Sequence, residues 1–357
     1  MRAGILLASL VVVLAAGIHA QQPALSRVEE AIVTRSMEQP QPSAYPVKMP
    51  AGVQLEVLPV LGNVYLIAGG KTNVAVQVGD EGALVVDTAT AEISDQIVTA
   101  IGVLTKAPIA YIVNTGFDPD RFGGNDKLSN AGWNPTLARP ALTGPGTRRP
   151  APVGAANAPQ RQEGATIFAH ENMLNRMSAP GQAGVALPFA LWPTNTFFTP
   201  RKTFSFNKEA IELIHTPSAY TDGDVMVFFR QSDVIVTGGV LNAVGYAPFD
   251  PGRGGSIKGV LSALNDIIDR AVPRFNQQAG TRIVPGKGRI LNEADVVEYR
   301  DMITIIHDRV KLGVEKRMTL AQIQAQQPTL DYDGLYSTSA LTGEKYVEAI
   351  YNELKKK

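Results

Sequence analysis

The sequence predicts an α/β protein in which two β-sheets pack together and helices cover their outer faces. Residues 54–87 contain short β-rich runs separated by Gly, Asn and Asp turns. A stretch with helical spacing follows at residues 91–104, and then the run "IAYIVNT", which is almost continuously apolar, as in a strand buried on both faces. Because strands and then helices recur in the second half, we expect a layered arrangement.

The first half contains five predicted strands and two predicted helices. The strands are "QLEVLPV", "NVYLIAGG", "TNVAVQVGD", "GALVVDT" and "IAYIVNT", and the helices are residues 91–104 and "GGNDKLSNAG". The second half adds "ATIFAH", "TFSFN", "AIELIHT", "DVMVFFR", "DVIVTGG" and "TRIVPG" as strands, with helices at residues 256–271, 292–311 and 343–355.

Composition gives no indication of a nucleic-acid or membrane partner. The chain has 357 residues, and Lys+Arg and Asp+Glu both number 33, so nothing in its net charge favours nucleic acid or an anionic membrane as a partner. The chain has no cysteine and therefore no disulfide. Residues 134–164 are rich in Pro, Ala, Gly and Arg and are interpreted as a surface insertion without a core of its own.

The amino-terminal residues have the proportions of a secretory signal. Residues 1–20 contain one Arg, then an apolar run too short to span a bilayer comfortably, then a plausible cleavage site after Ala20. The alternative is an uncleaved membrane anchor. We expect export to the periplasm or outside the cell, with residues 1–20 as signal peptide, residues 21–50 as a flexible leader and residues 51–357 as one domain.

Several stretches in order carry a resemblance to a known family. They are "NVYLIAGGKTNVAVQVGDEGALVVDT", "PIAYIVNTGFDPDRFGGN", "IELIHTPSAYTDGD", "VIVTGG" and "RIVPGKG". Together they resemble the strands and ligand loops of the metallo-β-lactamase superfamily, with Asp87 at the structural Asp of that family. The resemblance implies a four-layer αββα sandwich, two zinc ions held by His and Asp, and hydrolysis by a zinc-bound water.

Most of the positions that correspond to zinc ligands in the superfamily hold residues that are unsuited to binding zinc in this sequence. Asp120 matches an Asp ligand of the superfamily. Asp118 stands where the superfamily has a His, and its carboxylate is a second possible oxygen ligand. The other five positions hold residues that are poor ligands or none, namely Gly116, Arg121, Tyr220, Gly239 and Lys287. The four histidines of the chain are elsewhere: His19, His170, His215 and His307.

These replacements predict a site without zinc and without any other cofactor. Gly has no donor, Arg does not lose its proton, and Lys beside carboxylates stays charged. We therefore expect Arg121 or Lys287 to form ion pairs with Asp118 or Asp120 in the volume that metal would fill. The alternative is that these four residues are solvated in an open cleft.

Three hypotheses on function follow. The first is an exported, non-catalytic protein that binds a small molecule or a protein in the former metal pocket. The second is a hydrolase with metal-independent chemistry, in which Tyr220 and Lys287 form an acid/base pair and Asp120 orients water. The third is a hydrolase with one weakly bound magnesium or calcium ion on Asp118, Asp120 and Tyr220. No nucleic acid, and no membrane beyond the signal peptide, is expected as a partner.

Overall fold

The computed structural model describes residues 47–134, 164–180, 186–274 and 280–355. The predicted signal peptide, nearly all of the predicted leader and nearly all of the predicted insertion lie outside these ranges. Contacts within the chain separate residues 1–39 from residues 40–357, and only the second unit is described below. No helix of the described residues combines the length and the apolar character that a membrane crossing needs.

The first sheet has seven strands in sequential order, β1-β2-β3-β4-β5-β6-β7. The first four strands form antiparallel pairs, and β4 through β7 pair in parallel. The strands are β1 (Glu56–Leu61), β2 (Val64–Ala68), β3 (Val74–Gly79), β4 (Gly82–Val86), β5 (Ile109–Val113), β6 (Thr166–His170) and β7 (Asn195–Phe197). The predicted internal strands in "IAYIVNT" and "ATIFAH" are confirmed as β5 and β6.

The second sheet has five strands in the order β12-β11-β10-β9-β8. All neighbours are antiparallel except β11 and β12. Their bounds are β8 (Arg201–Phe206), β9 (Glu209–Thr216), β10 (Asp224–Phe229), β11 (Val234–Asn242) and β12 (Arg282–Lys287).

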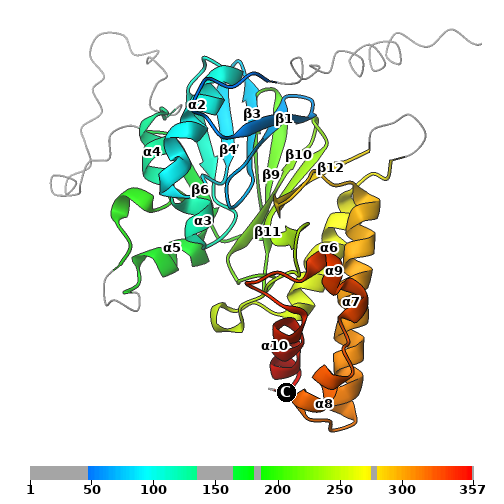
Figure 1. Cartoon of the computed structure of the whole chain (residues 1–357). Coiled ribbons are helices and arrows are strands. Elements are labelled where there is room, and N and C mark those ends of the chain that lie inside the picture. The colour runs from blue at the N-terminus through cyan, green and yellow to red at the C-terminus, as the bar shows by residue number, and fades with distance from the viewer. Residues whose placement is uncertain (1–46, 135–163, 181–185, 275–279, 356–357) are drawn as a thin grey trace, which may run out of the picture. The chain divides into compact units, whose positions relative to one another are not determined.

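Three layers of apolar packing produce the predicted αββα sandwich (Figure 1). One cluster lies between the two sheets and includes Leu84 of the first and Val227 of the second. A second joins the first sheet to α2 (Ser94–Leu104) and α4 (Asn125–Asn130). A third and larger cluster joins the second sheet to the helices that follow it, α6 (Ile257–Arg270), α7 (Glu293–Glu315) and α10 (Gly343–Lys355).

The helix boundaries follow from local capping. Ser256 accepts a hydrogen bond from the Gly259 amide and begins α6, and Asn292 with Asp295 forms a capping box at the start of α7. The sequence predicted the end of α7 near residue 311, four residues before its end at Glu315. It also did not identify α3 (Pro119–Phe122), α5 (Glu171–Ser178), α8 (Leu320–Ala325) and α9 (Leu330–Tyr336), three of which have seven residues or fewer.

Candidate functional site

The residues of the predicted site come together where the chain leaves β5. Residues 114–118 leave that strand, and Asp118 begins α3 by accepting a hydrogen bond from the Asp120 amide at 3.0 Å. Thr115 is fully buried and closely approaches Gly238 of β11, whose φ is +55°. A Cβ at Gly238 would lie 2.2 Å from the Thr115 hydroxyl, so only glycine allows the two sheets to approach this closely.

Arg121 lies at the centre of the site. Its carbonyl accepts hydrogen bonds from the Thr88 amide at 2.7 Å and the Thr88 hydroxyl at 3.2 Å, which fix the backbone of α3 against the end of β4. Its guanidinium points between the two sheets. A Cβ built on Gly239 would lie 3.4 Å from Arg121 Nη2, and one on Gly286 would lie 2.7 Å from the same atom. The arginine therefore fills space that is left by two glycines.

The partner of Arg121 is Asp87. Arg121 Nη1 lies 3.2 Å from Asp87 Oδ2, and the two side chains are 6% and 2% exposed. Asp87 also accepts hydrogen bonds from the Thr115 amide at 2.7 Å and the Thr115 hydroxyl at 2.6 Å. Burial raises the pKa of Asp87, while Arg121 and Thr115 oppose that rise. The guanidinium charge is thus balanced by a carboxylate that has further hydrogen bonds, while Arg121 Nε is buried without a hydrogen-bond partner among the described residues.

A second buried carboxyl, Asp224, lies beside this pair. It accepts hydrogen bonds from the Thr221 amide at 2.7 Å and the Thr221 hydroxyl at 2.9 Å. Burial raises the pKa of Asp224 to about 7, against the opposing effects of Thr221 and Arg121. A Cβ built on Gly116 would lie 2.9 Å from Asp224 Oδ1, so the first lost ligand position faces this carboxyl.

Tyr220 completes the inner wall together with Arg253. A Cβ on Gly239 would lie 3.1 Å from the Tyr220 ring, which places Tyr220, Gly239 and Arg121 together, as the resemblance implied. The Tyr220 hydroxyl accepts a hydrogen bond from Arg253 Nη2 at 3.1 Å, and Arg253 Nη1 donates to the Phe117 carbonyl at 2.8 Å. Arg253 Nε lies 2.6 Å from Asp250 Oδ2.

The predicted ion pairs of Asp118 and Asp120 with Arg121 or Lys287 are wrong. Asp118 caps α3, and Asp120 pairs across the surface with Lys71, whose Nζ lies 3.4 Å from its Oδ1. Successive residues of a helical turn point about 100° apart, so Asp120 faces outward where Arg121 faces inward. Lys287 follows Gly286 on β12, and its side chain forms no ion pair within the described ranges.

Three residues of the site were not identified from the sequence. Asp224 belongs to "TDGD", which we used as part of the resemblance to the superfamily, and its burial could not be read from that motif. Arg253 lies in "DPGRGG", where nothing distinguishes it from a solvated loop residue. Lys71 follows a glycine turn and gives no signal either. All three come from segments far from α3 in the sequence, so only the fold brings them together.

The donor set does not fit a catalytic zinc ion. Zinc needs three or four neutral imidazole, thiolate or carboxylate ligands around one point. Here that space holds the Arg121 guanidinium, and the carboxyls that border it, Asp87 and Asp224, already accept hydrogen bonds from Thr115 and Thr221. Within the described ranges no group of three or more His, Asp or Glu side chains could hold a metal ion.

Two histidines lie near the site but not in it. The rings of His170, at the end of β6, and His215, on β9, stack with centroids 3.7 Å apart. His170 Nδ1 accepts a hydrogen bond from the Asn172 amide at 3.3 Å, and its buried Nε2 has no partner in the part of the chain described. Burial, with the charge of His215, lowers the pKa of His170 to about 4.

Comparison with known proteins agrees with the fold. The sequence model of the family described as "Metallo-beta-lactamase superfamily" matches residues 59–274. The solved structure of the "stereoselective inverting sec-alkylsulfatase Pisa1 from Pseudomonas sp." matches with a TM-score of 0.58 and 16% identity, over 83% of this chain and 50% of that one. The structure of a metallo-beta-lactamase from Pontibacter korlensis matches with a TM-score of 0.50 and 15% identity, over 70% of this chain and 99% of that one.

The chain therefore spans about half the length of the alkylsulfatase. Identities this low show a shared fold and nothing about activity. No curated protein matches the chain.

Proposed function

Because the chain belongs to the metallo-β-lactamase superfamily, we propose that it keeps the fold of that superfamily without its metal chemistry and acts as a non-catalytic binding protein. The amino-terminal sequence supports export, so the binding would take place in the periplasm or outside the cell. The partner is a small molecule or a protein.

One observation carries the proposal: the Arg121 guanidinium lies between the two sheets and is paired with buried Asp87. A zinc hydrolase uses its metal to lower the pKa of a bound water and to stabilise the oxyanion that forms. A guanidinium does not lose its proton and cannot generate a hydroxide. It could stabilise an oxyanion, but here its charge is already balanced by Asp87.

The metal-independent hydrolase gains no support from the geometry. The proposed acid/base pair requires Tyr220 and Lys287 to exchange a proton, directly or through one water. No hydrogen bond joins these two side chains in the part of the chain described, and the Tyr220 hydroxyl accepts one from Arg253 instead. The single-metal hydrolase is equally disfavoured, because Asp120 pairs with Lys71 and Asp118 caps a helix.

An activity screen tests the proposal. The purified protein would be assayed against a generic carboxylic ester, a β-lactam and a secondary alkyl sulfate, with added zinc and with a chelator. We expect no turnover above the uncatalysed rate in any condition. Turnover that disappears with chelator, or that is lost in Arg121→Gln but kept in the control Lys127→Gln on the surface of α4, would overturn it.

A further inference from the structure

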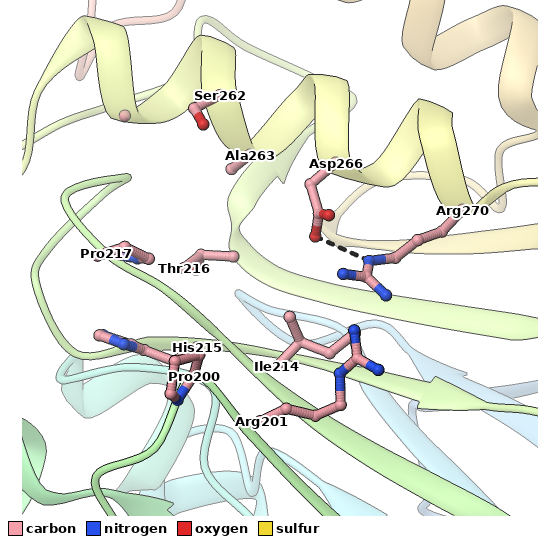
Figure 2. Close-up of a pocket in the computed structure, with 11 residues that line it drawn as sticks. Pro200, Arg201, Ile214, His215, Thr216, Pro217, Ser262, Ala263, Asp266 and Arg270 are labelled. Atoms are coloured by element: carbon pink, nitrogen blue, oxygen red, sulfur yellow. Dashed lines mark hydrogen bonds and ion pairs between the residues drawn. The ribbon is translucent and has the colours of Figure 1, made fainter.

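A pocket apart from the Arg121 cluster lies between α6 and the second sheet (Figure 2). Its volume is about 270 Å³. Its walls come from residues 200–201 where β8 begins, residues 214–217 at the end of β9, and one side of α6. Pockets for drug-sized ligands have volumes of roughly 300–1,000 Å³, so this one suits a smaller molecule.

The side of α6 that lines the pocket is set by its sequence. Ser262, Asp266 and Arg270 recur at intervals of four residues and therefore lie along one face of the helix. Gly259 holds the first turn against the loop after β9, because a Cβ there would lie only 1.6 Å from the Ser218 carbonyl oxygen. The helix cannot rotate this face away without losing that contact.

Two arginines reach the same end of the pocket, Arg201 from β8 and Arg270 from α6, as Figure 2 shows. The Nε atom of each arginine faces a carboxylate. Arg270 Nε donates a hydrogen bond to Asp266 Oδ2 at 2.8 Å, and Arg201 Nε lies 3.5 Å from Glu212 Oε2. Their side chains are 20% and 50% exposed. Neither uses its terminal Nη atoms in a hydrogen bond with another described residue, so those donors remain available to a ligand.

We propose that this pocket binds a small organic anion, with a carboxylate head between Arg201 and Arg270 and a short apolar body. Guanidinium groups bind carboxylates through paired N–H donors. Asp266 and Glu212 each face the Nε side of one arginine, so the anion would bind at the Nη groups of the two arginines. The remaining walls are mainly apolar and include Pro200, Ile214 and Pro217. They match a body of a few carbon atoms better than a second charge.

The inference does not depend on the function proposed above. None of the residues around Arg121 lines this pocket, so it would bind the anion whether or not the protein has an enzymatic activity.

Calorimetric titration of the full chain with benzoate tests the inference, with benzamide as a neutral probe of the same shape. We expect saturable binding of benzoate, and binding of benzamide weaker by about tenfold or more, because a charged partner is lost. Arg201→Gln and Arg270→Gln should each weaken benzoate binding to a similar degree.

Arg230→Gln is the matched control. Arg230 is 51% exposed and lies 3.6 Å from the same Glu212, but it does not line the pocket. The Arg230→Gln substitution also removes one positive charge. It should leave the benzoate affinity within about twofold of that of the wild type, since exposed charges at a distance are screened. Ser262→Trp, on an exposed position of α6 that lines the pocket, should block binding while the melting temperature stays close to that of the wild type.

Three results would overturn the inference. The first is the absence of saturable benzoate binding up to about 10 mM, because even a weak specific site would bind below that concentration. The second is equal affinity for benzoate and benzamide. The third is an equal loss of benzoate affinity in Arg201→Gln and Arg230→Gln. Unchanged benzoate binding in folded Ser262→Trp would place the bound anion elsewhere and overturn it as well.

Discussion

Arg121 Nη1 lies 3.2 Å from Asp87 Oδ2, and the pair is buried where the two sheets meet. Asp87 follows β4 in a left-handed conformation with φ of 62°, which Asp tolerates better than most residues. The carboxylate at the structural position of the superfamily therefore balances a protein cation.

The first prediction concerns the stability of the pair. Arg121→Met should lower the free energy of unfolding by about 3–5 kcal/mol, because it leaves the Asp87 carboxylate buried without its partner. Adding Asp87→Asn should recover part of that loss, since the uncompensated charge is then removed. Urea unfolding of the two single variants and the double variant measures this. Strictly additive losses would show that the two side chains are not coupled.

The second prediction concerns the cations outside the buried pair. Lys71 is 72% exposed in its pair with Asp120, and Lys287 has no ion pair within the described ranges. Lys71→Met and Lys287→Ala should each change the free energy of unfolding by at most about 1 kcal/mol, as exposed pairs contribute little. A loss as large as that of Arg121→Met would mean that the charge balance of the site has been assigned to the wrong cation.

The third prediction concerns Asp224. Burial raises its pKa to about 7 from an ordinary value of 3.8, so between those pH values the folded protein holds a proton that the unfolded chain has lost. The contribution of Asp224 to stability is therefore fully present below about pH 3.8 and is lost as pH rises toward 7. Asp224→Asn should remove this decline.

Chemical denaturation of wild type and Asp224→Asn at a series of pH values measures the effect. The Asn amide can still accept from the Thr221 amide and donate to its hydroxyl, so the local hydrogen bonds are retained. As pH rises, the free energy of unfolding of Asp224→Asn should increase relative to that of the wild type. Parallel curves from pH 4 to 7 would contradict the assigned pKa.

The fourth prediction concerns His170, whose titration should change stability with pH in the direction opposite to that of Asp224. Burial lowers its pKa to about 4 from 6.5, so between those values the unfolded chain binds a proton that the folded protein excludes. Stability should therefore fall as pH drops from about 6.5 to about 4. His170→Asn keeps an acceptor for the Asn172 amide and should make that fall smaller. Titration of the His170 ring by NMR with a midpoint near 6.5 would refute the prediction.

The sequence predicted the fold in detail because apolar patterns and turns mark nearly every strand. The continuous run of β5 and the order of strands and helices suggested two sheets with outer helices, and the resemblance to the superfamily distinguished this layout from other α/β arrangements. Short helices such as α8 and α9 were missed because six or seven residues span less than two turns and show no clear periodicity.

The site was predicted only in part. The resemblance to the superfamily implied that Arg121, Tyr220 and Gly239 lie together, because they match ligand positions of one metal site. It did not predict the direction of the Arg121 side chain, since only Asp118 and Asp120 were considered as partners and Asp87 was not. That choice depends on α3, which is capped by Asp118 and turns Arg121 toward the interior and Asp120 toward Lys71.

Zinc content tests the central claim most directly. The wild-type protein would be dialysed against zinc, freed of loosely bound metal and measured by elemental analysis. A variant with the ligands of the superfamily restored, carrying Gly116→His, Asp118→His, Arg121→His, Tyr220→His, Gly239→Asp and Lys287→His, would be measured beside it. We expect the wild type to retain well below one equivalent of zinc and the restored variant to retain at least one. One or more equivalents in the wild type, removed by a chelator, would contradict the claim that Arg121 has taken the place of the metal.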